Sequence, residues 1–178
     1  HKLFQGITTE IFGNCGTSPA PIESQLVPTM EKLAKNLGFT FNWRTLDEYF
    51  TILEKTGIQF NVATLTGHST LRGGALKDWN SVSENELSLM KHCMEESMHD
   101  GSLGLSTGLI YAPGCFAETD EIVELAKIAR KHGGVYASHM RDERDKLEEA
   151  IEETLTIGEM AEISVLVSHL KSAEKRNF

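Results

Sequence analysis

Short apolar runs rich in β-branched residues alternate along the chain with longer segments in which apolar residues recur every three or four positions. The short runs predict strands, and the recurring spacing predicts helices with one apolar face. We expect six strands, at residues 7–12, 39–43, 58–66, 102–107, 135–139 and 164–170. We expect five helices, at residues 24–37, 45–57, 83–100, 118–131 and 145–160.

Local signals at the helix ends support two of these boundaries. Thr45-x-x-Glu48 and Ser83-x-x-Glu86 are capping boxes, in which a hydroxyl and a carboxylate satisfy backbone N–H groups that the first turn leaves free. Glycines follow several of the predicted helices and are expected to end them. The segment after residue 66 is rich in glycine and polar residues, and it predicts a loop.

Strands that alternate with helices are typical of βαβ units and of a largely parallel sheet. Two architectures fit this order, a doubly wound sheet and part of a (β/α)₈ barrel. The first strand is followed neither by Gly-x-Gly-x-x-Gly nor by a phosphate loop. A complete barrel has eight strands and about 250 residues, whereas this chain has 178 residues. We therefore expect an α/β fold, and an incomplete (β/α)₈ (TIM) barrel with about six parallel strands fits the order as well as a doubly wound sheet does.

Three residues with metal-binding side chains lie at the ends of predicted strands. Cys15 follows the first strand, and His139 and His169 lie at the ends of the last two. In a barrel, functional groups sit at the carboxyl ends of the strands. A thiolate and two imidazoles suit Zn²⁺ and leave one coordination position open. Taken singly, each residue also fits an ordinary role as a small buried cysteine or a packed or exposed histidine.

Composition and charge narrow the classes of function. The net charge of −9 disfavours nucleic acid as a partner. No apolar run approaches the ~20 residues of a membrane span, and the first residues lack the order of a signal peptide. Cys15, Cys93 and Cys115 are odd in number and irregular in spacing, which predicts no disulfide framework. We therefore expect a cytoplasmic protein without nucleic-acid or membrane partners.

Five segments of the chain resemble the D-aminoacylase (N-acyl-D-amino-acid deacylase) branch of the amidohydrolase superfamily. The segments are Gln5–Pro21, Gly67–Arg72, Gly101–Gly114, Tyr136–Glu143 and Val167–Lys171. They span nearly the whole chain and occur in the same order as in that family. The resemblance implies that residues 1–178 are the central part of one metal-dependent barrel domain whose N- and C-terminal portions are absent.

The resemblance also implies roles for individual residues. Cys15, His139 and His169 match the zinc-binding positions of a family that holds one or two zinc ions, with the cysteine in a place that a carboxylated lysine takes elsewhere in the superfamily. Tyr111 and Lys171 match positions that hold the substrate carboxylate. Without the resemblance, Tyr111 fits a packed loop residue and Lys171 a solvated surface lysine.

Residues close to these positions are expected to support them rather than to bind metal. We expect His68 and Arg72 to order their loop or to hold the residues around the metal. Arg141, Asp142 and Glu143 follow His139 closely, so they either orient it by hydrogen bonds or are ordinary surface charges.

Two parts of the family's site are expected to lie outside this chain. The family has a His-x-His pair after its first barrel strand and an aspartate after its last strand that serves as a metal ligand and proton shuttle. We therefore expect no catalytic residue within these 178 residues. We also expect an isolated chain to self-associate through its exposed barrel edges.

The function that this resemblance implies is zinc-dependent hydrolysis of the amide bond of N-acyl-D-amino acids by the parent protein. The Gly-Asn-Cys-Gly segment at residues 13–16 favours this branch over cyclic amidohydrolases of the dihydroorotase or hydantoinase type. A metal-binding barrel fragment without catalytic activity remains the other alternative.

Overall fold

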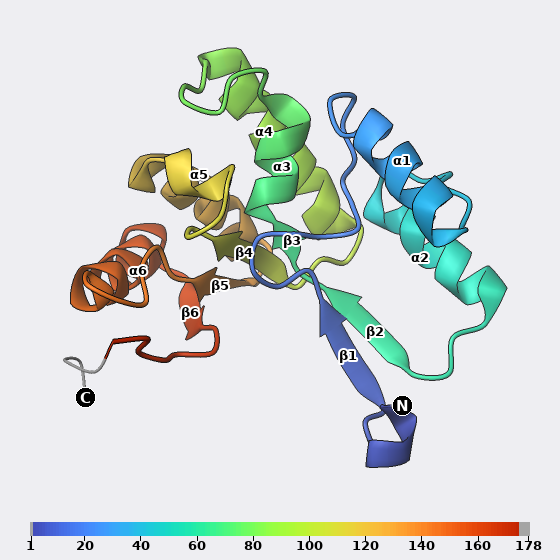
Figure 1. Ribbon diagram of the computed structural model, residues 1–178. Coiled ribbons are helices and arrows are strands. Elements are labelled where there is room, and N and C mark those ends of the chain that lie inside the picture. Colours follow the sequence, from blue (N-terminus) through green and yellow to red (C-terminus); the bar gives the residue numbers. More distant parts are fainter. Residues whose placement is uncertain (1, 175–178) are drawn as a thin grey trace.

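The computed structural model describes residues 2–174, in which parallel strands alternate with helices (Figure 1). Strands β1 (Thr9–Phe12) and β2 (Asn61–Thr64) form a two-stranded sheet, and β3 (Thr66–Gly67), β4 (Gly104–Gly108), β5 (Val135–His139) and β6 (Ser164–Val167) form a four-stranded sheet. The helices are α1 (Val27–Leu37), α2 (Leu46–Thr56), α3 (His68–Ala75), α4 (Glu84–His99), α5 (Thr119–Lys131) and α6 (Leu147–Ala161). Two short 3₁₀ helices, η1 (Leu3–Gln5) and η2 (Gly114–Phe116), complete the elements.

The order of the strands agrees with repeated βα units. Every described strand pair is parallel, and in the larger sheet each strand pairs with the next one along the chain. A doubly wound sheet would reverse the strand order at a switch point, and the described strands show no such reversal. The helices form an arc around the strands (Figure 1). The α/β class is confirmed, and closure of these elements into a barrel stays a prediction.

The main hydrophobic core lies between the four-stranded sheet and α3 to α6. Strand β4 is buried along its whole length, as a strand covered on both faces should be. Tyr136 of β5 and Met94 of α4 are fully buried, and Cys93 belongs to the same core, as its position on the apolar face of the helix indicates. Among the described residues, no helix has the length and the apolar character that a membrane crossing requires.

The predicted strand at residues 39–43 is wrong, because these residues form a loop in the structure. Trp43 is buried and donates a hydrogen bond from Nε1 to the Pro19 carbonyl at 2.9 Å. Phe41 packs edge-on against Trp43 with ring centroids 5.0 Å apart. The apolar pattern therefore reflects an aromatic cluster that packs on α2, and the backbone has no strand partner there.

The predicted single strand at residues 58–66 is divided in two at Leu65. The part before Leu65 is β2 and pairs with β1, whereas the part after it is β3 and pairs with β4. Gly13 lies so close to this point that an added Cβ would be 2.0 Å from the Leu65 carbonyl oxygen. A one-dimensional apolar pattern cannot show that a run of residues changes its strand partner.

The loop predicted after residue 66 is also wrong, because α3 begins directly at His68. Gly73 and Gly74 have low helix propensity, which explains the prediction. Burial of His68 and Arg72 in tertiary contacts outweighs that propensity. An added Cβ at Gly74 would lie 2.8 Å from the Glu23 Cβ, so the glycine permits a close approach of the chain.

The five predicted helices are confirmed as α1, α2, α4, α5 and α6, and both capping boxes are confirmed as well. Thr45 and Ser83 accept hydrogen bonds from the backbone N–H groups of Glu48 and Glu86, and each glutamate reaches back to the first residue of its box. The last strand is shorter than predicted, because β6 ends at Val167.

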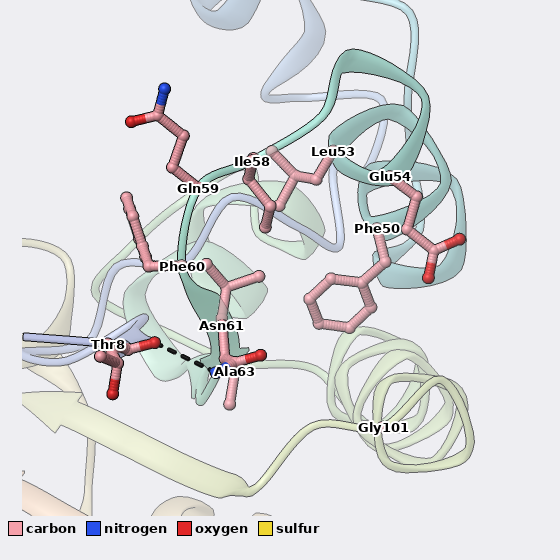
Figure 2. A pocket seen from close by; sticks show the side chains of 11 residues that line it. Thr8, Phe50, Leu53, Glu54, Ile58, Gln59, Phe60, Asn61, Ala63 and Gly101 are labelled. Atoms are coloured by element: carbon pink, nitrogen blue, oxygen red, sulfur yellow. Dashed lines mark hydrogen bonds between the residues drawn. The ribbon is translucent and has the colours of Figure 1, made fainter. Parts of the chain in front are cut away.

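A pocket of about 620 Å³ opens between α2 and the amino-terminal end of β2 (Figure 2). Phe50, Leu53 and Ile58 line it, and Asn61 Nδ2 donates to the Thr8 carbonyl at 3.1 Å. None of the predicted site residues lines this pocket. It lies at the start of β1 and β2, whereas the candidate ligands follow the carboxyl ends of strands.

Candidate metal centre

Cys15 lies in a tight turn three residues beyond β1. Its φ is 54°, in the left-handed region that non-glycine residues rarely adopt. Ser106 of β4 holds this turn, because its hydroxyl accepts from Gly16 N at 3.1 Å and donates to the Gly13 carbonyl. At Gly108, the end of β4, an added Cβ would lie 2.3 Å from the Cys15 carbonyl oxygen. The turn is thus packed directly against the carboxyl end of the neighbouring sheet.

His139 is the last residue of β5, and its side chain is only 5% exposed. Both of its ring nitrogens are buried, and neither makes a hydrogen bond. Unpaired buried nitrogens are costly, so they indicate a partner of another kind, such as a metal ion. Burial, with the nearby His169 as a smaller cause, lowers the pKa of His139. The neutral imidazole, which is the form that binds metal, is therefore favoured.

His169 lies two residues beyond β6 and reaches the same place. The backbone stays paired as far as Ser168, whose N–H donates to the Ser138 carbonyl at 2.9 Å. The Ser168 hydroxyl also bonds Asn14 Oδ1 at 3.0 Å, which links this loop to the turn that carries Cys15. His169 Nε2 lies 3.4 Å from Cys15 Sγ, and its ring centroid is 4.3 Å from that of His139.

The structure thus brings together the three predicted metal ligands. One ligand atom from each of Cys15, His139 and His169 lies within 4.8 Å of the others. Sulfur and imidazole nitrogen bind zinc at about 2.3 Å and 2.0–2.1 Å, so small side-chain movements place one ion between all three. Burial raises the pKa of the Cys15 thiol, while Lys171 acts in the opposite direction. Zinc binding would therefore release a proton from Cys15.

Glu143 joins the metal centre to Lys171. Its Oε1 lies 3.3 Å from His139 Nε2 and 3.5 Å from His169 Nδ1, and it forms an ion pair with Lys171 Nζ. Lys171 Nζ is in turn 3.4 Å from His169 Nδ1. The Glu143 side chain is only 11% exposed and so is not an ordinary surface charge; it contacts both histidines, although neither nitrogen of His139 makes a hydrogen bond.

Tyr111 lies at the edge of the same centre. Its ring packs edge-on against His139 with centroids 4.8 Å apart, and the residue is about half exposed. Its loop is held by backbone hydrogen bonds from Tyr111 N to the Gly108 carbonyl and from Cys115 N to the Tyr111 carbonyl. Tyr111 and Lys171, the predicted substrate-binding residues, therefore both contact candidate metal ligands.

His68 and Arg72 contact Glu121 of α5. His68 Nε2 is 2.7 Å from Glu121 Oε1, and Arg72 donates to both oxygens of that carboxylate at 2.8 and 3.2 Å. All three side chains are at most 3% exposed. Arg72 also donates to the Pro113 carbonyl at 3.2 Å, so this cluster orders the loop that carries Tyr111. His68 and Arg72 themselves lie in α3 rather than in the loop that the sequence predicted for them, so the loop that they support is a different one.

Arg141 holds the same loop from its other side. It makes a two-pronged ion pair with Glu153 of α6 at 2.9 and 2.8 Å. It also donates to the carbonyls of Cys115 and Ala117 at 3.1 and 3.0 Å. The described hydrogen bonds of Arg141 thus go to Glu153 and to the loop, and none of them goes to the imidazole of His139.

Glu121 and Glu153 were missed by sequence reasoning. Each lies on a helix whose surface positions are rich in acids, so neither stands out by type. Glu121 does precede Leu125 by one helical turn on the apolar face of α5. A charge on such a face signals a buried partner, although the pattern does not say which residue that partner is.

Several known proteins are similar to this chain along nearly its whole length. No family model matches the chain. D-aminoacylase of Alcaligenes xylosoxydans xylosoxydans is 37% identical over 178 residues, which are 99% of this chain and 37% of that protein. A crystal structure of D-aminoacylase superposes with a TM-score of 0.88 at 36% identity, again over 99% of this chain and 37% of that one. This chain is related to the D-aminoacylases.

Other relatives of this chain are also deacylases, and some of them are solved with a metal centre. N-acyl-D-aspartate deacylase of the same organism is 37% identical and matches 99% of this chain and 36% of that protein. N-acyl-D-glutamate deacylase of Bordetella bronchiseptica, solved with zinc and a phosphonate inhibitor, has a TM-score of 0.88 at 36% identity over 98% of this chain and 37% of that one. Another D-aminoacylase structure is described by its binuclear metal centre. The chain spans little more than a third of the length of these relatives.

Proposed function

We propose that the whole protein hydrolyses the amide bond of N-acyl-D-amino acids with the help of zinc. The observation that carries this proposal is the convergence of Cys15, His139 and His169 at the ends of separate strands, with both His139 nitrogens buried and without a hydrogen bond. The relatedness to D-aminoacylases that are solved with zinc or with a binuclear metal centre supports the same conclusion.

The proposal includes a (β/α)₈ barrel of which residues 1–178 are the central part. Sequential parallel pairing supports it, because each βα unit of a barrel lies beside the next. Ile11 of β1 and Leu166 of β6 are more than half exposed, although both belong to strands. Further strands of a barrel would cover them, and in an isolated chain they favour self-association.

Within the metal centre, Zn²⁺ supplies Lewis-acid chemistry that polarises a carbonyl and makes water nucleophilic at neutral pH. The chain's own residues bind and orient the substrate. We propose that the Lys171 ammonium binds the substrate carboxylate and that the Tyr111 hydroxyl donates to it. Glu143 holds Lys171 beside His169 until the substrate arrives. The proton acceptor is expected outside these residues.

A second candidate is a chain that binds metal without catalysing hydrolysis. The observation that favours it is that the described residues bring three metal ligands together, whereas the proton acceptor is not identified among them. Both candidates predict bound zinc, and they differ in turnover alone. A cyclic amidohydrolase, the remaining alternative, has no support from the relatives reported above.

Turnover of paired substrates separates these candidates. We expect the whole protein, loaded with zinc, to hydrolyse N-acetyl-D-methionine or N-acetyl-D-glutamate and to leave the L-isomers intact. Lys171→Met is expected to raise KM by about 10- to 100-fold with zinc content unchanged, because one charge-assisted hydrogen bond is worth roughly 1.5–3 kcal/mol. Lys146→Met is the matched control, since the Lys146 side chain forms an ion pair with Glu149 at the surface and is 71% exposed.

The outcomes of this assay are distinct. Zinc binding by the whole protein without turnover of any of these substrates would contradict the deacylase proposal and support the metal-binding candidate. Equal turnover of D- and L-isomers would contradict the stereochemical part of the proposal. An unchanged KM in Lys171→Met would remove Lys171 from the substrate site.

A further inference from the structure

A second group of potential metal ligands lies at the opposite end of the βα units from Cys15. It consists of Glu95 and His99 in the last turns of α4 and of His132, which caps the carboxyl end of α5. Helices α4 and α5 run back from the carboxyl ends of the strands, so their own carboxyl ends lie where β4 and β5 begin. This group therefore faces away from the candidate metal centre.

The geometry of the group is close to that of a coordination site. One ligand atom of each residue lies within 4.8 Å of the others. His132 Nε2 is 2.8 Å from Glu95 Oε1, and His99 Nε2 is 3.9 Å from the same oxygen. The two imidazole rings meet edge to face with centroids 4.8 Å apart.

Only a small movement is needed to surround one ion. Ligand atoms of one tetrahedral zinc ion lie roughly 3.4 Å apart, given zinc–ligand distances of about 2.0–2.1 Å. The Glu95–His132 pair must open by about half an ångström, and His99 must approach by a similar amount. The His99 side chain is 68% exposed, and so it can move without disturbing the core. His132 is only 21% exposed and is already fixed by Glu95.

The electrostatic surroundings favour a cation. Two helices end at this point, and the free carbonyl groups of a helix end carry partial negative charge. Glu95 adds a carboxylate, whose Oε1 lies 2.8 Å from His132 Nε2. Lys131 lies near enough to weaken this field but does not supply a ligand.

We propose that Glu95, His99 and His132 bind a zinc ion that joins the carboxyl ends of α4 and α5. Two imidazoles and one carboxylate are a common zinc ligand set, and they leave the fourth position to water. The site is independent of Cys15, His139 and His169. Its consequence is a cross-link between two helices that otherwise meet through apolar packing and surface ion pairs, so that zinc stabilises the folded chain.

Zinc binding to the full chain tests the proposal through equilibrium dialysis with elemental analysis. A Cys15→Ser chain isolates the second group, and we expect it to retain roughly one zinc ion at a free concentration well above the dissociation constant. His99→Ala or His132→Ala in that background should weaken the remaining zinc affinity by at least tenfold, because even an outer partner of a metal site is worth roughly 10- to 100-fold.

His92→Ala is the matched control. His92 lies on the same helix, is 68% exposed and pairs with Glu96 one turn away, as His99 does with Glu95. We expect its zinc affinity to stay within about twofold of the Cys15→Ser chain. Equal affinities of the His92, His99 and His132 variants would overturn the proposal, and so would the absence of zinc from the Cys15→Ser chain.

Thermal unfolding keeps the test independent of any folding defect in a single variant. In the Cys15→Ser background, zinc at about 100 times the dissociation constant should raise Tm by roughly 5 °C or more. His99→Ala removes an exposed side chain and should leave the zinc-free Tm unchanged while it abolishes most of that rise. A full zinc-induced rise in the His99→Ala chain would overturn the proposal.

Discussion

Replacing Cys15 with serine is expected to weaken zinc binding at the candidate metal centre by more than about 100-fold, since loss of an outer partner alone costs roughly 10- to 100-fold. The thiolate is the only anionic ligand of the three, and a serine hydroxyl does not ionise at neutral pH to replace it. His139 and His169 alone would leave two positions open. Competition with a chromophoric chelator at fixed pH measures the affinity.

Cys115→Ser is the matched control for this substitution. Cys115 is partly exposed like Cys15 and is a free thiol, but only its backbone groups make described hydrogen bonds, to Tyr111 and Arg141. We expect its zinc affinity to equal that of the unaltered chain. If Cys15→Ser and Cys115→Ser chains bind zinc equally well, Cys15 is not a ligand.

Glu121→Ala is expected to destabilise the fold by about 3–5 kcal/mol, the cost of breaking a buried ion pair by removing one partner. The substitution leaves the Arg72 guanidinium buried without its carboxylate and removes the one described hydrogen bond of His68. Urea unfolding gives the free energy of unfolding directly.

Glu124→Ala, three residues further along α5, is the control. Glu124 forms ion pairs with Lys91 at 2.6 Å and Lys127 at 2.9 Å, but its side chain is 36% exposed. Exposed ion pairs contribute about 0–1 kcal/mol, so we expect little change in the free energy of unfolding. If Glu121→Ala and Glu124→Ala lower the free energy of unfolding by similar amounts, the buried ion pair of Glu121 stabilises the fold no more than an exposed one does.

The same cluster predicts how stability depends on pH. Burial by itself would raise the pKa of Glu121, but the hydrogen bonds from His68 and Arg72 outweigh it and hold the pKa below its ordinary value of 4.5. A carboxyl whose pKa is lowered by folding stabilises the fold above its ordinary pKa, and the contribution is lost as pH falls through the lower, folded value. The free energy of unfolding should therefore fall below about pH 4.5 less steeply in Glu121→Gln than in the unaltered chain.

The sequence predicted the starts of two helices because helix capping depends on residues that are close together in the chain. The capping boxes at Thr45 and Ser83 involve residues within one helical turn, and both were found in the structure. The failures have tertiary causes. Residues 39–43 join an aromatic cluster rather than a sheet, and α3 forms despite its glycines because its side chains are buried.

For the candidate site, too, the sequence predicted which edge of the sheet holds the ligands but not the contacts between the side chains around them. Alternation of strands and helices placed Cys15, His139 and His169 at one edge, since parallel strands end on the same side. The contacts of Glu143 with Lys171 and both histidines depend on how loops fold over that edge. The same is true of the ion pairs of Arg72 and Arg141, whose partners lie 49 and 12 residues away in the chain. No spacing in the sequence encodes those partners.

The central claim is that Cys15, His139 and His169 together bind one zinc ion. Zinc K-edge X-ray absorption of a His99→Ala chain, loaded with one equivalent of zinc, tests this claim. The substitution removes the zinc site that we propose at Glu95, His99 and His132. We predict one sulfur ligand at about 2.3 Å and nitrogen ligands at about 2.0–2.1 Å around the zinc. Zinc coordinated by nitrogen and oxygen alone, with no sulfur, would contradict the claim.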